Sequence, residues 1–368
     1  MLMIPGPSDP EPEVLAELSL PILPHYGDKW MTVYQDTLSM MQKVFNTKNE
    51  VFILPAPGHL AVEMAVGNLA DKGQDVFICS NGFFADTIIG MARALGTNPV
   101  LVTSPLGRGP TLEEVKAAVE SRGDPTGKPI FLVQNETSTG AATNPSEIFR
   151  YCKSKGMLTA LDSISAIGAI EVRADDWKVD YAIGYSSKAL GGIFGAQPVA
   201  VGKEAWEAAA RKKGKISSTF LDLNTWREAI DVDSSWGHPF PTSMPTSAVV
   251  ALRKALSMAM EEGLENRYRR HADAAKELRE GVKDLGLELF TDPAFFSAAV
   301  TVPKLEEKLN AELRKRLVKD YDIMIAGGLG PLRGKIVRIG TMGSSAKHEK
   351  VQMVLAAMGS ILKQIRAQ

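Results

Sequence analysis

Short apolar runs alternate with helical patterns between residues 51 and 202, and this alternation restricts the fold more than any other feature of the sequence. Helical patterns at 60–70, 86–95, 112–121 and 146–155 separate most of the runs. Strands that alternate with helices favour crossover connections and a parallel sheet, and continuous apolar runs suit strands covered on both faces. We therefore predict an α/β fold with a mainly parallel seven-stranded sheet, built from the runs Val51–Leu54, Val76–Cys79, Val100–Val102, Ile130–Val133, Leu158–Leu161, Tyr181–Tyr185 and Pro198–Val201.

The pattern changes after about residue 245, where long helical stretches dominate and two short β-like runs, Ala298–Val302 and Ile336–Ile339, interrupt them. The first ten residues contain three prolines and one glycine, which favours an extended arm. We expect an N-terminal arm at 1–14, a large domain at 15–250 and a smaller C-terminal α+β domain at 251–368. Outside the alternating region, the predicted helices are 31–46, 247–262, 264–284, 305–319 and 347–365.

Charge and composition exclude several classes of function. The 368 residues carry 42 Lys+Arg against 43 Asp+Glu, so there is no electrostatic reason to bind nucleic acid or an anionic membrane. No stretch reaches the roughly 20 apolar residues that span a bilayer, and the N-terminus lacks the basic start of a signal peptide. Two cysteines, Cys79 and Cys152, cannot supply a four-ligand zinc site, and the five histidines show no metal-ligand spacing. We expect a soluble cytoplasmic protein without a metal.

Two residues whose side chains are suited to catalysis follow predicted strands. Lys188 comes after the run that ends at Tyr185, and Asp162 comes directly after Leu158–Leu161. Ligands of open α/β sheets bind beyond the carboxyl ends of the strands. A lysine there can form a Schiff base, although most lysines after a strand are merely solvated. A carboxylate there can hold a protonated ring nitrogen, or it can simply cap the next turn.

Two further segments complete a pattern. LPAPGHLAVEM at 54–64 places a Pro/Gly loop before a helix, and free N–H groups at a helix N-terminus bind phosphate without any basic side chain. NGFF at 81–84 follows the next strand, so Phe83 or Phe84 would lie over a planar ring or pack in the core. A phosphate cradle, an aromatic side chain, an acid and a lysine are together what a pyridoxal phosphate site requires.

These motifs resemble those of the class V aminotransferases, a family of pyridoxal 5′-phosphate enzymes with fold type I. The branch that the sequence resembles most contains alanine–glyoxylate and serine–pyruvate aminotransferases. The resemblance covers nearly the whole chain, and Lys188 follows Asp162 by 26 positions. The landmarks are PGPS at 5–8, APGHLAVE at 56–63, NGFF at 81–84, NETSTG at 135–140, LDSISAIGAIEV at 161–172, YSSKALGG at 185–192 and GKIVRIGTMG at 334–343.

The resemblance implies roles for the residues around the cofactor ring. Lys188 would form the imine with the cofactor and then move the proton between substrate and cofactor. Asp162 would hold the pyridine nitrogen, and Thr137 would donate to the ring hydroxyl oxygen. Phe84 would take the place of the stacking aromatic. These assignments make Lys188 and Asp162 the predicted catalytic residues.

The resemblance also implies a phosphate site and a substrate site. The loop of Pro57, Gly58 and His59 would offer backbone amides to the phosphate, and Ser187 stands where many relatives have Gln. Arg338 would grip the substrate carboxylate with two parallel hydrogen bonds, for which a planar guanidinium is suited. Gly6 and Pro7 of the arm would line the substrate pocket.

Family members use residues of a partner subunit at the phosphate, which implies a homodimer. The corresponding segment is HPFPTSMPT at 238–246, where Phe240 and Ser243 would fill those places. The expected reaction moves an amino group from a small amino acid, alanine or serine, to a 2-oxo acid such as glyoxylate or pyruvate.

Related activities remain as alternatives. A 2-aminoethylphosphonate–pyruvate aminotransferase is the nearest rival, because the segment SMPTSAVVAL at 243–252 resembles the sequence of such enzymes. A pyridoxamine–pyruvate aminotransferase is less favoured, since it would not need the phosphate cradle, and a phosphoserine aminotransferase would need an extra basic cluster. A cysteine desulfurase needs a cysteine well after the lysine, and none follows Cys152. A non-catalytic scaffold would have no reason to keep Lys188, Asp162 and Arg338 together.

Overall fold

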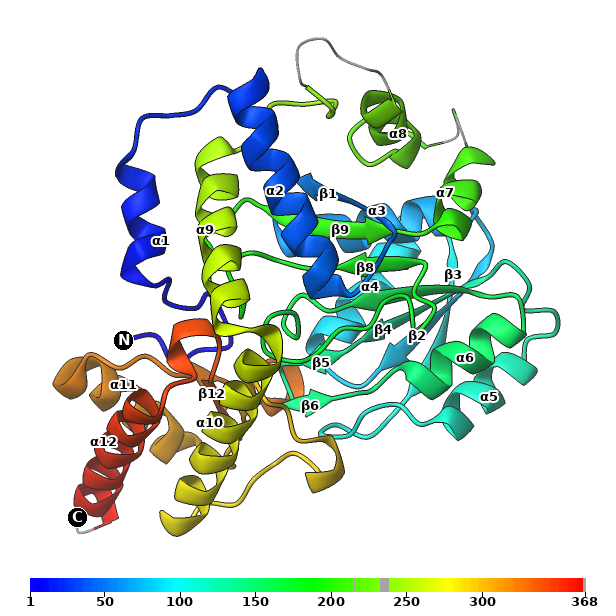
Figure 1. Ribbon diagram of the computed structural model, residues 1–368. Helices are drawn as coiled ribbons and strands as arrows, with labels where there is room; N and C mark the ends of the chain where they lie inside the picture. Colours follow the sequence, from blue (N-terminus) through cyan, green and yellow to red (C-terminus); the bar gives the residue numbers. More distant parts are fainter. Residues whose placement is uncertain (213, 215, 232–237, 367–368) are drawn as a thin grey trace.

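The computed structural model describes residues 1–212, 214, 216–231 and 238–366. Its centre is a seven-stranded sheet in the order β1-β9-β8-β7-β4-β2-β3, in which only β9 runs antiparallel to its neighbours (Figure 1). All seven predicted strands are confirmed close to their expected bounds, and so is the α/β class. The strands are β1 Glu50–Leu54, β2 Asp75–Ser80, β3 Asn98–Thr103, β4 Pro129–Val133, β7 Leu158–Asp162, β8 Tyr181–Ile183 and β9 Gln197–Val201.

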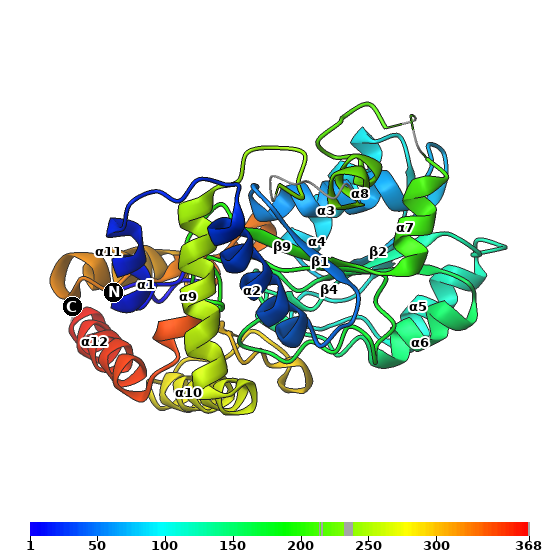
Figure 2. The same ribbon diagram turned by 45° about the horizontal axis from the view of Figure 1, so that its top comes forward.

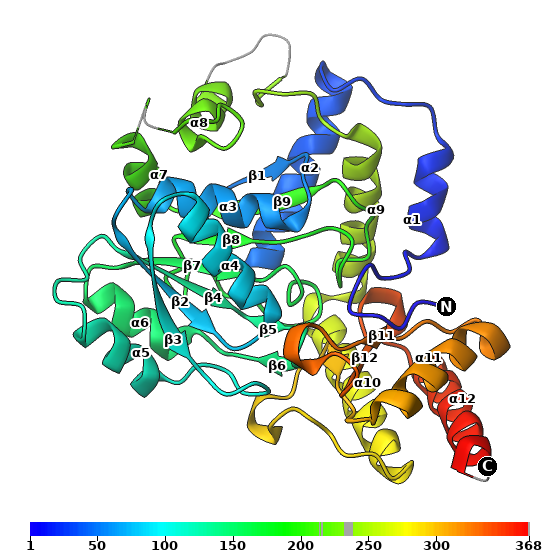
Figure 3. The same cartoon turned by 180° about the vertical axis from the view of Figure 1, so that it is seen from behind.

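Helices cover both faces of this sheet, which explains why the central strands are mostly apolar and buried. α3 (Gly58–Leu69) and α4 (Phe83–Ala94) lie on one face, and α5 (Leu112–Glu120) and α6 (Ser146–Ser154) lie on the other (Figures 2 and 3). Every residue of β4 and β9 is buried. α3 and α4 begin two or three residues before their predicted starts at 60 and 86. Their first turns therefore lie directly beside the strand ends.

The second unit contains long helices and a three-stranded sheet in the order β10-β12-β11. Its elements are α10 Leu264–Asp284, β10 Val300–Thr301, α11 Glu307–Tyr321, β11 Ala326–Gly327, β12 Val337–Gly340 and α12 His348–Arg366. The predicted helices and both β-like runs are present, and the unit has its own apolar core around Leu278, Leu313 and Met358. The predicted boundary at 250 falls inside α9 (Thr246–Glu262), whose Val249, Leu252 and Leu256 belong to the core of the large sheet.

The N-terminal arm runs along the second unit. Gly340 at the end of β12 donates its N–H to the carbonyl of Met3, and Met3 donates to Met324. The arm is shorter than the predicted 1–14, because α1 (Pro12–Ala16) begins with a proline at its first position. α1 is followed by a single 3-10 turn at 17–19 and by α2 (Asp28–Phe45), which packs against α9.

Several short elements are absent from the sequence prediction. They are α7 Lys203–Ala210, α8 Leu223–Asp231, the two-residue strands β5 Asn135–Glu136 and β6 Ala141–Ala142, and single 3-10 turns at 293–295, 330–332 and 343–345. The two-residue strands and the single turns carry too few residues for a periodic pattern. Across the described ranges, no helix combines the length and the apolar character that crossing a membrane demands.

Candidate active site

A cavity of about 210 Å³ opens at the carboxyl ends of the parallel strands. Its walls come from segments that follow β1, β2, β4, β7 and β8, which are far apart in the sequence. This is the edge at which open α/β sheets bind ligands. Six of the predicted site residues line the cavity: Pro57, Gly58, His59, Phe84, Asp162 and Lys188.

Lys188 lies in a turn after β8, and the N-terminal arm holds that turn. Its Nζ donates to the carbonyl oxygen of Pro5 at 3.0 Å, and its own carbonyl accepts from the Ser8 hydroxyl at 2.6 Å. Burial and the nearby Arg338 lower the pKa of Lys188 to about 8, and Asp162 opposes this shift. A large fraction of the amine is therefore unprotonated at mildly basic pH, and this is its nucleophilic form.

Asp162 ends β7 and faces the same cavity. One carboxylate oxygen accepts from the Ile164 N–H at 2.9 Å. Burial raises the pKa of Asp162 to about 7, the Ile164 N–H opposes this, Glu136 adds to it, and Lys188 opposes it. A carboxylate with this pKa stays ionised most readily when a cation lies against it. A protonated ring nitrogen is a cation that fits this position.

The start of α3 supplies an anion site without basic side chains. The N–H of Leu60 donates to Pro57, and that of Ala61 donates to the side chain of Gln197 at 3.3 Å. The first N–H groups of a helix have no intrahelical acceptor, so those of Gly58 and His59 are suited to a phosphate. Gln197 also donates to the Gly58 carbonyl at 2.6 Å and so fixes the loop at the start of α3.

Ser187 is buried, and its hydroxyl oxygen has no hydrogen-bond partner within the described part of the chain. Buried polar atoms are nearly always satisfied, so an atom of this kind beside Lys188 marks a place for a ligand oxygen or a water. Ser187 does not itself line the cavity. Its predicted role in cofactor binding stays a prediction.

Phe84, in the first turn of α4, is the aromatic wall of the cavity, and its ring centroid is 6.4 Å from that of His59. Phe83 lies beside Gly330 of the second unit instead, and 41% of it is exposed. A fully buried glutamate, Glu136, fixes this turn. It accepts from the Ala85 N–H at 2.9 Å and from the Ser138 N–H at 2.9 Å. Nothing in the sequence alone singled out Glu136.

Arg338 comes from β12 of the second unit and is 7% exposed. Its Nε donates to the Gly327 carbonyl at 2.8 Å, and its Nη1 lies 3.4 Å from the Thr137 carbonyl. Burial lowers the pKa of Arg338 to about 10, so it remains charged at neutral pH. Thr137 is buried beside Arg338 but does not line the cavity. The predicted bond from Thr137 to a ring hydroxyl stays a prediction.

The arm lies directly against Lys188. Gly6 has φ +104°, and a Cβ at this position would be 2.2 Å from Lys188 Nζ. Only glycine therefore fits between the arm and Lys188 without a shift of one of them. Pro7 continues the arm towards Ser8, whose N–H donates to the Ser187 carbonyl.

The two residues predicted to serve a partner subunit lie away from the cavity. Phe240 is 1% exposed, and its ring packs edge-on against Trp30 and Tyr34 of the same chain. The predicted contact of Phe240 with a partner's phosphate stays a prediction. Ser243 is exposed. It remains a prediction as a partner contact.

The cavity also contains residues that the motifs did not single out. Asn135 donates to the Ser165 carbonyl at 2.8 Å, and its oxygen has no partner in the described ranges. Tyr185 accepts from Gly195, and Phe194 is 62% exposed at the rim. Their position just after strand ends was the available signal. Among the residues that the structure describes, no group of His, Cys, Asp or Glu is arranged to hold a metal ion.

Residues 22–352 match the family described as aminotransferase class-V. An uncharacterised aminotransferase of Methanocaldococcus jannaschii is 31% identical over 99% of this chain and 93% of its own length. The (S)-ureidoglycine–glyoxylate transaminase of Bacillus subtilis is 29% identical over 98% of this chain and 90% of its own length. The solved structure of an alanine–glyoxylate aminotransferase from Nostoc sp. has a TM-score of 0.92 and 28% identity, covering 98% of this chain and 94% of that chain.

Proposed function

Because this chain belongs to the class V aminotransferases, which use pyridoxal phosphate, we propose that it transfers an amino group from a small amino acid, alanine or serine, to a small 2-oxo acid such as glyoxylate or pyruvate. The bound cofactor supplies an electron sink for the substrate α-carbon. Lys188 binds the cofactor and holds the proton that moves at that carbon. Asp162 stabilises the protonated ring nitrogen, and Arg338 orients the substrate carboxylate.

The closeness of Gly6 to Lys188 is the observation that carries the choice of a small substrate. The arm leaves no space for even one methyl group at Gly6 above the lysine nitrogen. The cavity measures about 210 Å³ and Phe84 forms one of its walls, which suits a donor with a small side chain. The carboxylate is directed towards Arg338, since that guanidinium has donors left over after its bonds to two carbonyls. Glyoxylate as acceptor is supported by the names of the Bacillus subtilis and Nostoc proteins.

The phosphoserine alternative is disfavoured by the charge of the cavity, and the phosphonate alternative by the lack of a carboxylate on its donor. A donor with a second anion requires a second cation, and Lys188 is the only Lys or Arg among the described residues that line the cavity. The first turn of α3 is occupied with the cofactor phosphate in this proposal. The donor 2-aminoethylphosphonate would also leave Arg338 without a carboxylate.

A screen of half-reactions tests the proposed substrates. The visible absorption of the bound cofactor is followed after addition of alanine, serine, (S)-ureidoglycine, leucine or 2-aminoethylphosphonate, and then of each 2-oxo acid. We expect alanine or serine to convert the cofactor fastest and leucine to be at least about tenfold slower, because overpacking a filled site costs about 1–3 kcal/mol. Fastest conversion by 2-aminoethylphosphonate would contradict the proposal.

Replacement of the lysine tests the assignment of the catalytic residue. Lys188→Ala removes the amine that binds the cofactor, and we expect loss of turnover together with loss of the visible band of the imine. Lys153→Ala, in which the lost lysine is ion-paired to Asp180 away from the cavity, is a matched control for the loss of a positive charge. Retained turnover in Lys188→Ala would place the catalytic amine elsewhere.

We further propose that the enzyme is a homodimer. Large apolar side chains are exposed in the segment after α1, with Leu20 57% and Ile22 81% exposed, and Phe194 is exposed at the rim of the cavity. Contiguous exposed apolar residues favour an interface with another chain. Sedimentation should give twice the chain mass of 39.8 kDa. A fully active monomer at assay concentration would contradict this proposal.

We place the protein in the cytoplasm. This is supported by Cys79 and Cys152, both of which are buried and free. Burial raises the pKa of the Cys152 thiol to about 12, so it has little tendency to react or to form disulfides. Fractionation of cells with an antibody to this chain tests the placement, and recovery from a secreted or organelle fraction would contradict it.

A further inference from the structure

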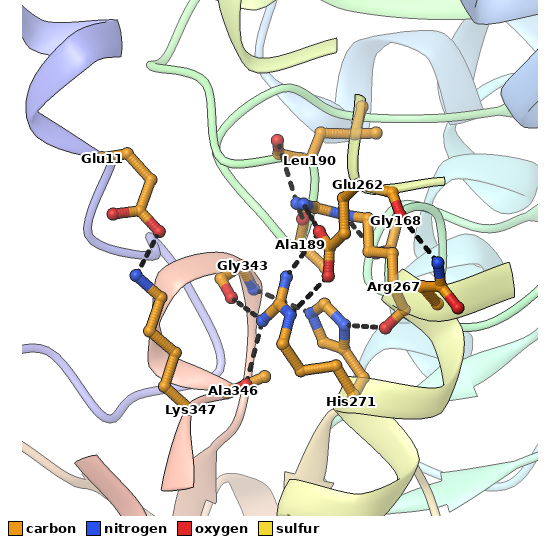
Figure 4. Close-up of polar contacts among 12 residues, drawn as sticks. Glu11, Gly168, Ala189, Leu190, Glu262, Arg267, His271, Gly343, Ala346 and Lys347 are labelled. Atoms are coloured by element: carbon orange, nitrogen blue, oxygen red, sulfur yellow. Dashed lines mark hydrogen bonds and ion pairs between the residues drawn. The ribbon is translucent and has the colours of Figure 1, made fainter. Parts of the chain in front are cut away.

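A buried arginine of the second unit reaches the back of the active-site loops. Arg267, in the first turn of α10, is 7% exposed, and its guanidinium points towards Gly168 and Ala189 (Figure 4). Its Nε donates to the Gly168 carbonyl at 2.9 Å and its Nη2 to the Ala189 carbonyl at 2.7 Å. Its Nη1 donates to Glu262 at 3.0 Å. All three nitrogens of the fork are thus engaged.

The two carbonyls belong to the segments that carry the catalytic residues. Ala189 directly follows Lys188, and Gly168 lies in the loop that leaves β7 at Asp162. The two segments touch at this point, since a Cβ on Gly168 would lie 3.0 Å from the carbonyl oxygen of Ala189. Arg267 therefore bonds both sides of the contact between the lysine turn and the aspartate loop.

Glu262 joins this arginine to a second one, Arg270. The carboxylate accepts from Arg270 Nε at 2.6 Å and from its Nη2 at 3.0 Å. The remaining nitrogen of Arg270 donates at 2.9 Å to the carbonyls of both Gly343 and Ala346. These two residues form the turn directly after β12, the strand that carries Arg338. One carboxylate is thus shared between the lysine side and the arginine side of the active site.

Among the described residues that line the adjoining cavity, every cation is ion-paired, and Asp9, a carboxylate outside these pairs, accepts from the Leu2 N–H at 2.8 Å. This cavity, of about 240 Å³, is lined by Glu11, Lys347 and the Glu262 cluster. Within the described chain, Lys347 pairs with Glu11 at 2.8 Å, while both arginines pair with Glu262 (Figure 4). None of these side chains lines the active-site cavity. They can act on catalysis only through the backbone that they hold.

We propose that Arg267, Glu262 and Arg270 are positioning residues. Together they hold the segments of Lys188 and Asp162 at a fixed position relative to Arg338. Arg267 fixes the two catalytic segments, Arg270 fixes the turn beyond β12, and Glu262 ties the two guanidinium groups together. The proposal rests on the aminotransferase reaction of the family but not on which donor is used. Two effects should therefore be separable. Arg267 acts on the rate of proton movement through the segments of Lys188 and Asp162, and Arg270 acts on binding of the substrate carboxylate through the turn beyond β12.

Three variants of the full-length holoenzyme test this separation. Arg267→Lys keeps the charge but loses the fork that spans two carbonyls, so we expect kcat to fall about tenfold or more with KM changed less than about threefold. Arg270→Lys should instead raise KM for the amino acid, with a smaller effect on kcat. Glu262→Gln removes the shared charge and should change both kcat and KM.

Two further readouts separate positioning from a merely structural role. We expect Arg267→Lys to shift the pH midpoint of the cofactor's visible band, and to shift the pH midpoint for acylation of Lys188 in the cofactor-free protein. Cofactor affinity should remain within about threefold, because the phosphate is held by α3, which the cluster does not touch. Arg316→Lys is the matched control, since that arginine pairs with Asp320 and Gln364 away from the site.

The proposal is overturned if Arg267→Lys leaves kcat and both pH midpoints unchanged. It is also overturned if kcat, cofactor affinity and melting temperature fall together, since that result describes a structural brace alone. Should Arg267→Lys not fold, Glu262→Gln is tested by the same measurements. Changes in both kcat and KM would support the proposal, and unchanged values of both would refute it. A wrong choice of substrate would slow all variants and the parent protein alike, so it is distinguishable from failure of the proposal.

Discussion

The side-chain nitrogen of Lys188 lies 3.0 Å from the carbonyl oxygen of Pro5, although 183 positions separate the two residues in the chain. The arm that carries Pro5 is attached to the second unit through Met3, which accepts from Gly340 at the end of β12. Lys188, the proposed catalytic lysine, and β12, which carries the proposed substrate-binding Arg338, are therefore in contact with the same few residues of the arm. Small changes in the arm are expected to alter catalysis directly.

Gly6→Ala is expected to reduce kcat/KM by about 100-fold or more, because misplacement of a reacting group by about 1 Å has that effect. The new Cβ would be 2.2 Å from Lys188 Nζ, so either the lysine or the arm must move. Steady-state kinetics and cofactor absorbance measure the effect. Gly123→Ala is the control, because Gly123 also has a positive φ, +70°, but has open space around it. Equal activity of the two variants would show that the arm does not restrict Lys188.

Arg338→Lys is expected to raise KM for amino acids and 2-oxo acids by roughly 10–100-fold, since a point charge does not replace a two-pronged guanidinium. The remaining amine would also have to satisfy the Gly327 and Thr137 carbonyls that Arg338 now contacts. Initial rates over a range of substrate concentrations measure this, with cofactor affinity as the control. An unchanged KM for carboxylate substrates would remove Arg338 from the substrate site.

Asp162→Asn is expected to stabilise the cofactor-free protein at pH 8 but not at pH 4. Burial raises the pKa of Asp162 from 3.8 to about 7, so folding loses stability as the pH rises through that window. The neutral amide avoids this loss, which is worth on the order of 2 kcal/mol once water in the cavity is considered. Thermal melting at both pH values measures the effect.

In the holoenzyme the same variant should have the opposite consequence. An amide in place of the Asp162 carboxylate cannot hold a protonated ring nitrogen as a charged partner, so we expect the cofactor to be retained and most of the rate to be lost. A rate near that of the parent would show that another group protonates the ring. Asp124→Asn, at an exposed loop position, controls for the loss of a carboxylate.

The strands and the motif residues at their ends were predictable, because continuous apolar runs and the residues that follow them are local features. Asp162, Lys188 and Phe84 reach one cavity for this reason. Arg267 was not predictable, since the run around it, Glu265–Arg270, has the composition of a solvated helix face. Its burial depends on the packing of α10 against two loops that lie about 80 and 100 residues earlier.

The packing of Phe240 within its own chain was also not evident from the sequence. A motif position placed Phe240 at a partner's phosphate, which stays a prediction; within its own chain the ring packs edge-on against Trp30 and Tyr34, which stack on each other. Glu136 and Gln197 escaped prediction because each acts on backbone N–H groups of a distant helix start, at Ala85 and Ala61. Such contacts depend on tertiary structure, and a single sequence contains no periodic signal for them.

His271 should make the protein sensitive to acid. The Arg267 carbonyl can only accept, so Nδ1 carries the hydrogen, and Nε2 accepts from the Gly343 N–H at 3.0 Å. Burial, together with the nearby Arg267 and Arg270, lowers the pKa of His271 from 6.5 to about 3, against opposing effects of its hydrogen bond to the Arg267 carbonyl and of Glu262. The unfolded chain therefore binds a proton that the folded chain does not, and stability present above pH 6.5 is lost as the pH falls towards 3.

His271→Gln is expected to flatten this loss, because an amide can make both hydrogen bonds without titrating. Within the window each pH unit costs the parent protein up to about 1.4 kcal/mol from this residue alone. Urea unfolding at pH 7, 6, 5 and 4 measures the slope, and His348→Gln on the exposed surface of α12 serves as the control. The parent and His271→Gln should differ most in slope between pH 6 and 4. Parallel lines for the two proteins would show that His271 is not the group that couples folding to pH.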